Sequence, residues 1–124
     1  MSPSQKLTIG IDLGATKIAS VLLAENGEVV ASSQIPTGAS DGTATVLDRV
    51  ASQIYELQQQ ASAEVIGIGV GSPGKVDSTH GVVYDAVNLG WEKINLLDEI
   101  SKRIDQSLPV WIQKDTNLSA LGEY

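Results

Sequence analysis

A short turn between two apolar runs constrains this chain more than any other feature of its sequence. The segment Gly-Ile-Asp-Leu-Gly-Ala-Thr-Lys occupies residues 10–17, between the apolar runs 7–11 and 18–23. Both runs have the composition of β-strands, so the chain must reverse direction between them. Gly14 provides the backbone freedom of a tight turn, and Thr16 and Lys17 provide hydrogen-bond donors. Backbone N–H groups in such a turn form a concave anion site, to which the lysine adds positive charge.

This turn predicts a phosphate site. Asp12 ends the first strand and is placed to hold a hydrated magnesium ion. The segment is not a Walker A loop, because the Gly-x-x-x-x-Gly-Lys-Ser/Thr spacing is missing and a strand follows where a helix would be required. From this motif alone, an ordinary hairpin turn without a ligand is the alternative.

The first half of the chain predicts a meander of three strands and one helix. Strands are expected over residues 7–12, 17–24 and 28–35, with Asn26-Gly27 as the hairpin turn between the second and third. Apolar residues at positions 46, 50, 54, 57 and 61 form the one-sided stripe of an amphipathic helix over residues 43–61.

The second half predicts further alternation of strands and helices. Strands are expected over residues 65–71, 75–77, 82–85 and 110–113, with a loop over 88–91. A helix over 96–106 is expected to begin after the capping residue Asn95, and another begins near Asp115. The order βββαβ(ββ)αβα predicts an α/β fold, a mixed sheet with flanking helices.

Composition excludes several classes of function. The net charge is −7 and the eight lysines and arginines are scattered, which argues against a nucleic-acid surface. The chain has no cysteine, as is typical of proteins of the reducing cytoplasm, and no apolar run approaches the length of a membrane span. Residues 69–74 fit Gly-x-Gly-x-x-Gly, but a strand is predicted after Gly74 and Pro73 removes a donor, so a dinucleotide site is rejected.

Four segments together carry a family resemblance. They are the turn at 10–17, Gly-Ser-Pro-Gly-x-Val-Asp at 71–77, Asn-Leu-Gly-Trp at 88–91, and Gln-Lys-Asp-Thr-Asn-Leu-Ser-Ala-Leu-Gly-Glu at 113–123. In this order and spacing they resemble the N-terminal lobe of the ROK family, which includes bacterial glucokinases, over residues 7–124. The resemblance implies the ribonuclease H-like fold of the actin, Hsp70 and sugar-kinase ATPase superfamily.

The resemblance also implies roles for single residues. Gly74 and Asn88 would contact the sugar, Lys114 would lie beside it, and Asp115 would be the general base that deprotonates the 6-hydroxyl. The ATP phosphates and Mg²⁺ would meet the residues of the turn, which are Asp12, Gly14, Ala15, Thr16 and Lys17.

Alternatives exist for several of these residues. A carboxylate at a helix N-terminus is stabilised as the anion, which suits a base, but Asp115 is equally a good helix cap. Asn88 is alternatively a loop residue that bonds its own backbone. Trp91 and Trp111 are expected to pack, and His80 is expected to be exposed and without a role.

Lys114 departs from the family pattern. The kinases of the family usually carry Asn directly before the catalytic Asp, and Asn both donates and accepts hydrogen bonds, whereas Lys only donates and adds charge. A positive neighbour would also lower the pKa of the base and weaken it. Lys114 therefore puts the specificity for glucose in question, and to a lesser degree catalysis.

The resemblance makes residues 1–124 one lobe of a longer hexose kinase that acts in the cytoplasm, the expected oligomer being a homodimer or larger. The C-terminal lobe would carry the adenosine pocket and any structural zinc, so residues 1–124 alone would be inactive. One alternative is a sugar-sensing transcriptional regulator, whose DNA-binding domain would precede the first strand; Met1 lies close to that strand, which weighs against it. Another alternative is a kinase for an N-acetylated hexosamine.

Overall fold

The computed structural model describes residues 6–104 and 107–114. The helix predicted from residue 115 lies outside this range. The strands are β1 (Leu7–Leu13), β2 (Lys17–Ala24), β3 (Val29–Pro36), β4 (Val65–Ser72), β5 (Lys75–Asp77), β6 (Val82–Ala86), β7 (Trp91–Asn95) and β8 (Val110–Lys114). The helices are η1 (Ala39–Asp41), α1 (Thr43–Gln60), η2 (Val87–Leu89) and α2 (Leu96–Ser101).

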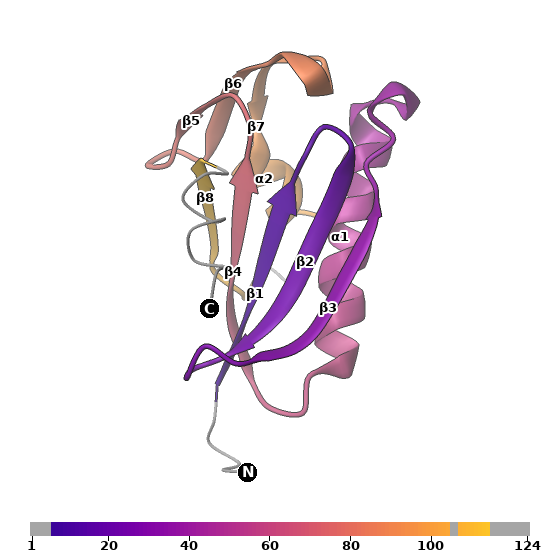
Figure 1. The fold of residues 1–124 in the computed structure, drawn as a ribbon. Coiled ribbons are helices and arrows are strands. Elements are labelled where there is room, and N and C mark those ends of the chain that lie inside the picture. Colours follow the sequence, from indigo (N-terminus) through magenta and orange to yellow (C-terminus); the bar gives the residue numbers. More distant parts are fainter. Residues whose placement is uncertain (1–5, 105–106, 115–124) are drawn as a thin grey trace.

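The main sheet is mixed, as the sequence predicts. Its strand order is β3-β2-β1-β4-β8 (Figure 1). The first three strands form the predicted antiparallel meander, and β4 and β8 add to β1 in parallel. The connections β3–α1–β4 and β4–α2–β8 contain helices, because strands of one sheet that run in the same direction are joined by crossovers.

Helix α1 covers one face of this sheet (Figure 1). The alternation along β1 and the helical spacing along α1 predict the two faces that meet there. The side chains at this interface are fully or almost fully buried. They include Ile9, Ile11, Leu13, Ile18, Leu22, Val46, Val50, Ile54 and Leu57. Within the described part of the chain, no helix combines the length and the apolar character needed to cross a bilayer.

A second sheet of order β5-β6-β7 lies beyond the carboxyl ends of β4 and β8 (Figure 1). Its third strand, β7, was not predicted; it begins at Trp91, the last residue of the predicted loop at 88–91, and Trp91 pairs with Ala86. The strand was missed because only Trp91 and Ile94 of its five residues are apolar, which is too few to show an alternation. Trp91 is buried, as predicted, and its indole N–H donates to Thr43 Oγ1 at 3.2 Å.

Helix α2 is shorter than predicted. Its cap is correct, since Asn95 Oδ1 accepts from the N–H of Asp98 at 3.2 Å. The helix ends at Ser101, however, and not at residue 106. Its end is stabilised by Arg103, whose guanidinium donates to the carbonyl oxygen of Glu99 at 2.8 Å.

Candidate functional site

Three parallel strands end at the same edge of the main sheet. Asp12 of β1 is in register with Gly71 of β4, and Gly71 is in register with Gln113 of β8. One residue further, Ser72 pairs with Lys114. Because parallel strands share one direction, the carboxyl ends of β1, β4 and β8 lie side by side at this edge (Figure 1). Ligands of open α/β sheets bind at such edges.

The predicted phosphate turn is a tight hairpin at this edge. Leu13 pairs with Ile18, and the N–H of Gly14 donates to the carbonyl oxygen of Lys17 at 3.0 Å. A Cβ atom on Gly14 would lie 2.9 Å from that same oxygen, so the turn requires glycine here. The side chains of Thr16 and Lys17 are exposed, and Ala15 is partly buried.

Thr37 fixes this turn through two hydrogen bonds. The sequence did not indicate it. Its N–H donates to the carbonyl oxygen of Thr16 at 2.9 Å, and its Oγ1 donates to that of Gly14 at 2.7 Å. Thr37 is completely buried, although it directly follows the exposed Pro36. No local pattern indicates it, because its partners lie more than twenty positions earlier in the chain.

The Pro73-Gly74 turn follows β4 at the same edge. Gly74 has φ +89°, and a Cβ atom there would lie 2.6 Å from the carbonyl oxygen of Tyr84 and 3.0 Å from the nitrogen of Ala86. The backbone of the turn therefore packs directly on β6, which by itself explains the glycine. On another side, Lys114 Nζ donates to the carbonyl oxygen of Gly74 at 2.6 Å.

Of the two remaining predicted site residues, the structure describes Asn88 but not Asp115. Asn88 is exposed on η2, in the connection between β6 and β7. Just before it, Asp85 adopts the left-handed φ of 55° and lies 3.7 Å from the ammonium of Lys75. Asp115 follows Lys114 directly but lies outside the described residues. The structure thus brings together the phosphate turn, Gly74 and Lys114.

The donor set fits a magnesium ion that remains largely hydrated. The described residues contain no group of three or more His, Cys, Asp or Glu side chains that would enclose a metal. Asp12, partly buried at the end of β1, is a single carboxylate beside the turn. Mg²⁺ keeps several waters and is commonly bound by one or two carboxylates together with substrate phosphates.

The shifted pKa values in the structure belong to ion pairs outside the phosphate turn. The hydrogen bond from His80, whose Nδ1 lies 2.8 Å from Asp77 Oδ2, lowers the pKa of Asp77. His80 itself is exposed, as predicted. Hydrogen bonds from Arg103 and Lys102 lower the pKa of Glu99.

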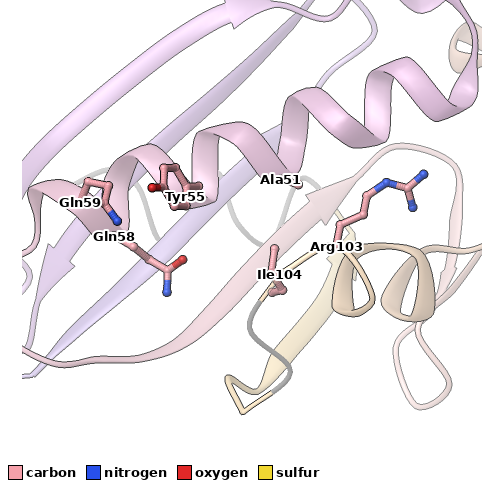
Figure 2. A pocket seen from close by; sticks show the side chains of 6 residues that line it. All are labelled: Ala51, Tyr55, Gln58, Gln59, Arg103 and Ile104. Atoms are coloured by element: carbon pink, nitrogen blue, oxygen red, sulfur yellow. The ribbon is translucent and has the colours of Figure 1, made fainter.

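A pocket of about 340 Å³ lies away from the predicted site (Figure 2). It is formed along the second half of α1 and just after α2. Its walls are Ala51, Tyr55, Gln58, Gln59, Arg103 and Ile104. None of these residues belongs to the motifs at the carboxyl edge.

Trp111 packs as expected, but only in part, since half of its surface is exposed. Its ring lies over Gly67, where an added Cβ would collide with it. Gly67 therefore leaves the space that the ring of Trp111 occupies on this part of β4.

The mixed sheet, the meander joined by an Asp-Leu-Gly turn and the helices on the sheet define the actin, Hsp70 and sugar-kinase class of fold. The sequence profile of the ROK family matches residues 8–124. The chain belongs to the ROK family.

Individual relatives agree with this assignment. The chain is 34% identical over 123 residues to a glucokinase of Halalkalibacterium halodurans. This alignment covers 97% of this chain and 37% of the relative. It is 31% identical over 119 residues to the xylose repressor of Caldicellulosiruptor bescii, and this alignment covers 93% of this chain and 29% of the relative. The crystal structure of a ROK family glucokinase from Streptomyces griseus in complex with glucose and AMPPNP superposes with a TM-score of 0.82 and 30% identity, over 95% of this chain and 36% of that chain. The chain thus spans about a third of the length of these relatives.

Proposed function

We propose that residues 1–124 form the N-terminal lobe of a cytoplasmic, ATP-dependent hexose kinase that phosphorylates glucose at the 6-hydroxyl. The observation that carries the proposal is the register of Asp12, Gly71 and Gln113, because it sets the phosphate turn, the Pro73-Gly74 turn and the end of β8 at one edge. Support also comes from the glucokinase relatives and from a related kinase that was crystallised with glucose and AMPPNP.

In this proposal the phosphate turn binds the ATP phosphates. The backbone of Gly14 and Ala15 approaches the phosphate oxygens, and the exposed Thr16 and Lys17 donate to them. Asp12 would hold Mg²⁺ through water, and the ion would supply positive charge beside the phosphates. These groups orient the γ-phosphate without covalent chemistry of their own.

The sugar lies between Gly74, Asn88, Lys114 and Asp115. The carboxylate of Asp115 accepts the proton of the 6-hydroxyl as its oxygen forms a bond to the γ-phosphorus. The bond between that phosphorus and the β–γ bridging oxygen breaks, and ADP leaves. The second lobe, outside residues 1–124, supplies the adenosine pocket and closes on the substrates, and the whole protein is a homodimer or larger.

A panel assay with the whole protein tests this proposal. ATP-dependent phosphorylation is measured on glucose, mannose, fructose, N-acetylglucosamine and N-acetylmannosamine, with Asp115→Asn as the matched variant. We expect turnover on glucose that Asp115→Asn abolishes while sugar affinity stays within about twofold. Turnover only on an N-acetylated sugar would replace glucose by that class of substrate. Loss of folding together with binding in Asp115→Asn would indicate that Asp115 is only a helix cap.

A sugar-responsive transcriptional regulator is the second candidate. It is favoured by the xylose repressor among the relatives and by Lys114 at the position before Asp115. The same assay separates the two functions, because a regulator binds a sugar and turns none over. Retention of the phosphate turn favours the kinase, since a regulator has no need of it.

A further inference from the structure

Arg49 of α1 organises the loop that follows β3. Its Nη1 donates to the carbonyl oxygens of Thr37 at 2.8 Å and Gly38 at 3.3 Å. Its Nη2 forms an ion pair with Asp41 Oδ2 at 2.8 Å. One guanidinium therefore binds three residues of the same short loop in the fork geometry for which arginine is suited.

The backbone of the loop is shaped to admit this guanidinium. Gly38 adopts φ +63°, and a Cβ atom there would collide with Nη1 of Arg49. The same atom would lie 2.7 Å from Asp41 Oδ2. The glycine therefore leaves the space in which the arginine and Asp41 meet.

The loop in turn positions the phosphate turn through Thr37. Arg49 accepts no hydrogen bond and donates to the carbonyl of Thr37, while both donors of Thr37 are directed to the carbonyl oxygens of Gly14 and Thr16. The described peptide bonds are all trans, so the N–H of each peptide points opposite to its carbonyl. Holding these two carbonyls toward Thr37 directs the N–H groups of Ala15 and Lys17 away from it.

We propose that Arg49 and Thr37 are positioning residues that orient the backbone N–H groups of the phosphate turn for the nucleotide phosphates. The inference rests on the proposed function as far as the nucleotide is concerned. Neither side chain contacts the substrate; Arg49 acts through Thr37, and Thr37 acts through the carbonyls of the turn.

The energetics support an orienting role. The side chain of Arg49 is 33% exposed and that of Asp41 is 52% exposed, and ion pairs within reach of solvent contribute little to stability. The bond from Arg49 to the carbonyl of Thr37 differs from this ion pair, because Thr37 is completely buried. Without Arg49 this carbonyl would lose a hydrogen-bond partner, which is costly for a buried group. Removal of Arg49 should therefore disturb the geometry of the turn more than the global stability.

Arg103 provides a matched control. It also connects α1 to another element, with Nε donating to Asp48 Oδ1 at 2.9 Å and Nη1 donating to Glu99. Asp48 is the immediate neighbour of Arg49, but among the described residues Arg103 bonds Asp48 and Glu99 and not the loop after β3 or the phosphate turn. Arg103→Gln thus removes a comparable set of contacts, of which the one with Asp48 is on α1.

The experiment uses the whole protein and compares Arg49→Gln, Thr37→Val and Thr37→Ser with Arg103→Gln. Hydrogen–deuterium exchange without ligand is followed in a peptide that contains residues 14–17. We expect about tenfold faster exchange there in Arg49→Gln and Thr37→Val, with Thr37→Ser close to wild type because it keeps the hydroxyl. With ATP, the KM for ATP should rise about tenfold in the same two variants, while the KM for the sugar stays within about twofold.

Two results would overturn the inference. One is exchange at 14–17 that is equal in Arg49→Gln and Arg103→Gln; the other is a rise in both KM values together. If the wild-type protein turns over no sugar, the proposed function fails, and the exchange measurement still decides whether Arg49 and Thr37 position the turn. If Arg49→Gln does not fold, the comparison of Thr37→Val with Thr37→Ser decides.

Discussion

The ammonium of Lys114 donates a hydrogen bond of 2.6 Å to the carbonyl oxygen of Gly74. This contact joins the end of β8 to the turn that follows β4, across 40 positions of sequence. An asparagine side chain is much shorter than a lysine side chain. The residue usually found before the catalytic Asp in ROK kinases is therefore not expected to reproduce this bond.

The first prediction concerns this bond. Lys114→Met keeps most of the length of the side chain but removes the charge and the donor. Since Gly74 lies on the proposed sugar side, we expect the KM for the sugar to rise about fivefold, the effect of losing about 1 kcal/mol of hydrogen bonding. The KM for ATP should not change. Steady-state kinetics of the whole protein measure both values.

Lys114→Asn tests specificity at the same position. Because Asn offers both a donor and an acceptor to sugar hydroxyls, we expect the ranking of kcat/KM among glucose, mannose and N-acetylglucosamine to shift toward glucose. An unchanged ranking in Lys114→Asn, together with an unchanged sugar KM in Lys114→Met, would remove Lys114 from the sugar site.

The second prediction separates packing from backbone conformation at Gly74. Gly74 and Gly27 have nearly equal φ angles, +89° and +88°, but an added Cβ finds nothing within 4 Å at Gly27. Alanine should therefore have the same conformational cost at both positions. Only at Gly74 would its Cβ atom also collide with β6. We expect Gly74→Ala to be more destabilising than Gly27→Ala by about 1–3 kcal/mol, as in overpacked cores. Urea unfolding measures the difference, and equal stabilities would contradict the packing on β6.

Much of the fold could be predicted because its signals are local. The Asn26-Gly27 turn, the stripe along α1 and the capping of α2 by Asn95 each depend on residues close in sequence. The position of Asp12 at the carboxyl edge could also be predicted, because it depends only on where the first strand ends.

The parts that were missed depend on distant partners. Thr37 has a role only because Gly14 and Thr16 lie beside it after β2 and β3 have paired. β7 exists because β6 offers an unpaired edge to a short segment of weak alternation. For Gly74, the sequence indicated a sugar contact, and the structure adds a second reason for glycine, its packing on β6.

The third prediction concerns the effect of pH. The hydrogen bond from His80 holds the pKa of Asp77 below its ordinary value of 3.8. A carboxyl whose pKa is lowered by folding stabilises the folded state above the unfolded pKa, and this stabilisation is lost as the pH falls through the lowered value. His80→Ala should therefore raise the pKa of Asp77, observed by NMR titration of its carboxyl carbon. Unfolding measurements should show a small stability difference from wild type above the ordinary pKa of Asp, and this difference should disappear as the pH falls through the lowered pKa of Asp77. An unchanged pKa in His80→Ala would show that the bond is not made in solution.

The fourth prediction tests the proposed role of Asp12. Asp12→Asn keeps the size of the side chain and removes its negative charge, so the register of β1 with β2 and β4 should be preserved. If Asp12 holds Mg²⁺ through water, the affinity for the ion in the presence of ATP should fall by about 10–100-fold, as for other outer-shell ligands. Turnover should recover in part at high Mg²⁺, whereas the KM for the sugar should not change. Asp48→Asn, which removes an exposed carboxylate on α1, is the control and should leave the Mg²⁺ dependence unchanged. Equal Mg²⁺ dependence in Asp12→Asn and wild type would exclude Asp12 from the metal site, and the turn would then bind phosphate through its backbone, Thr16 and Lys17.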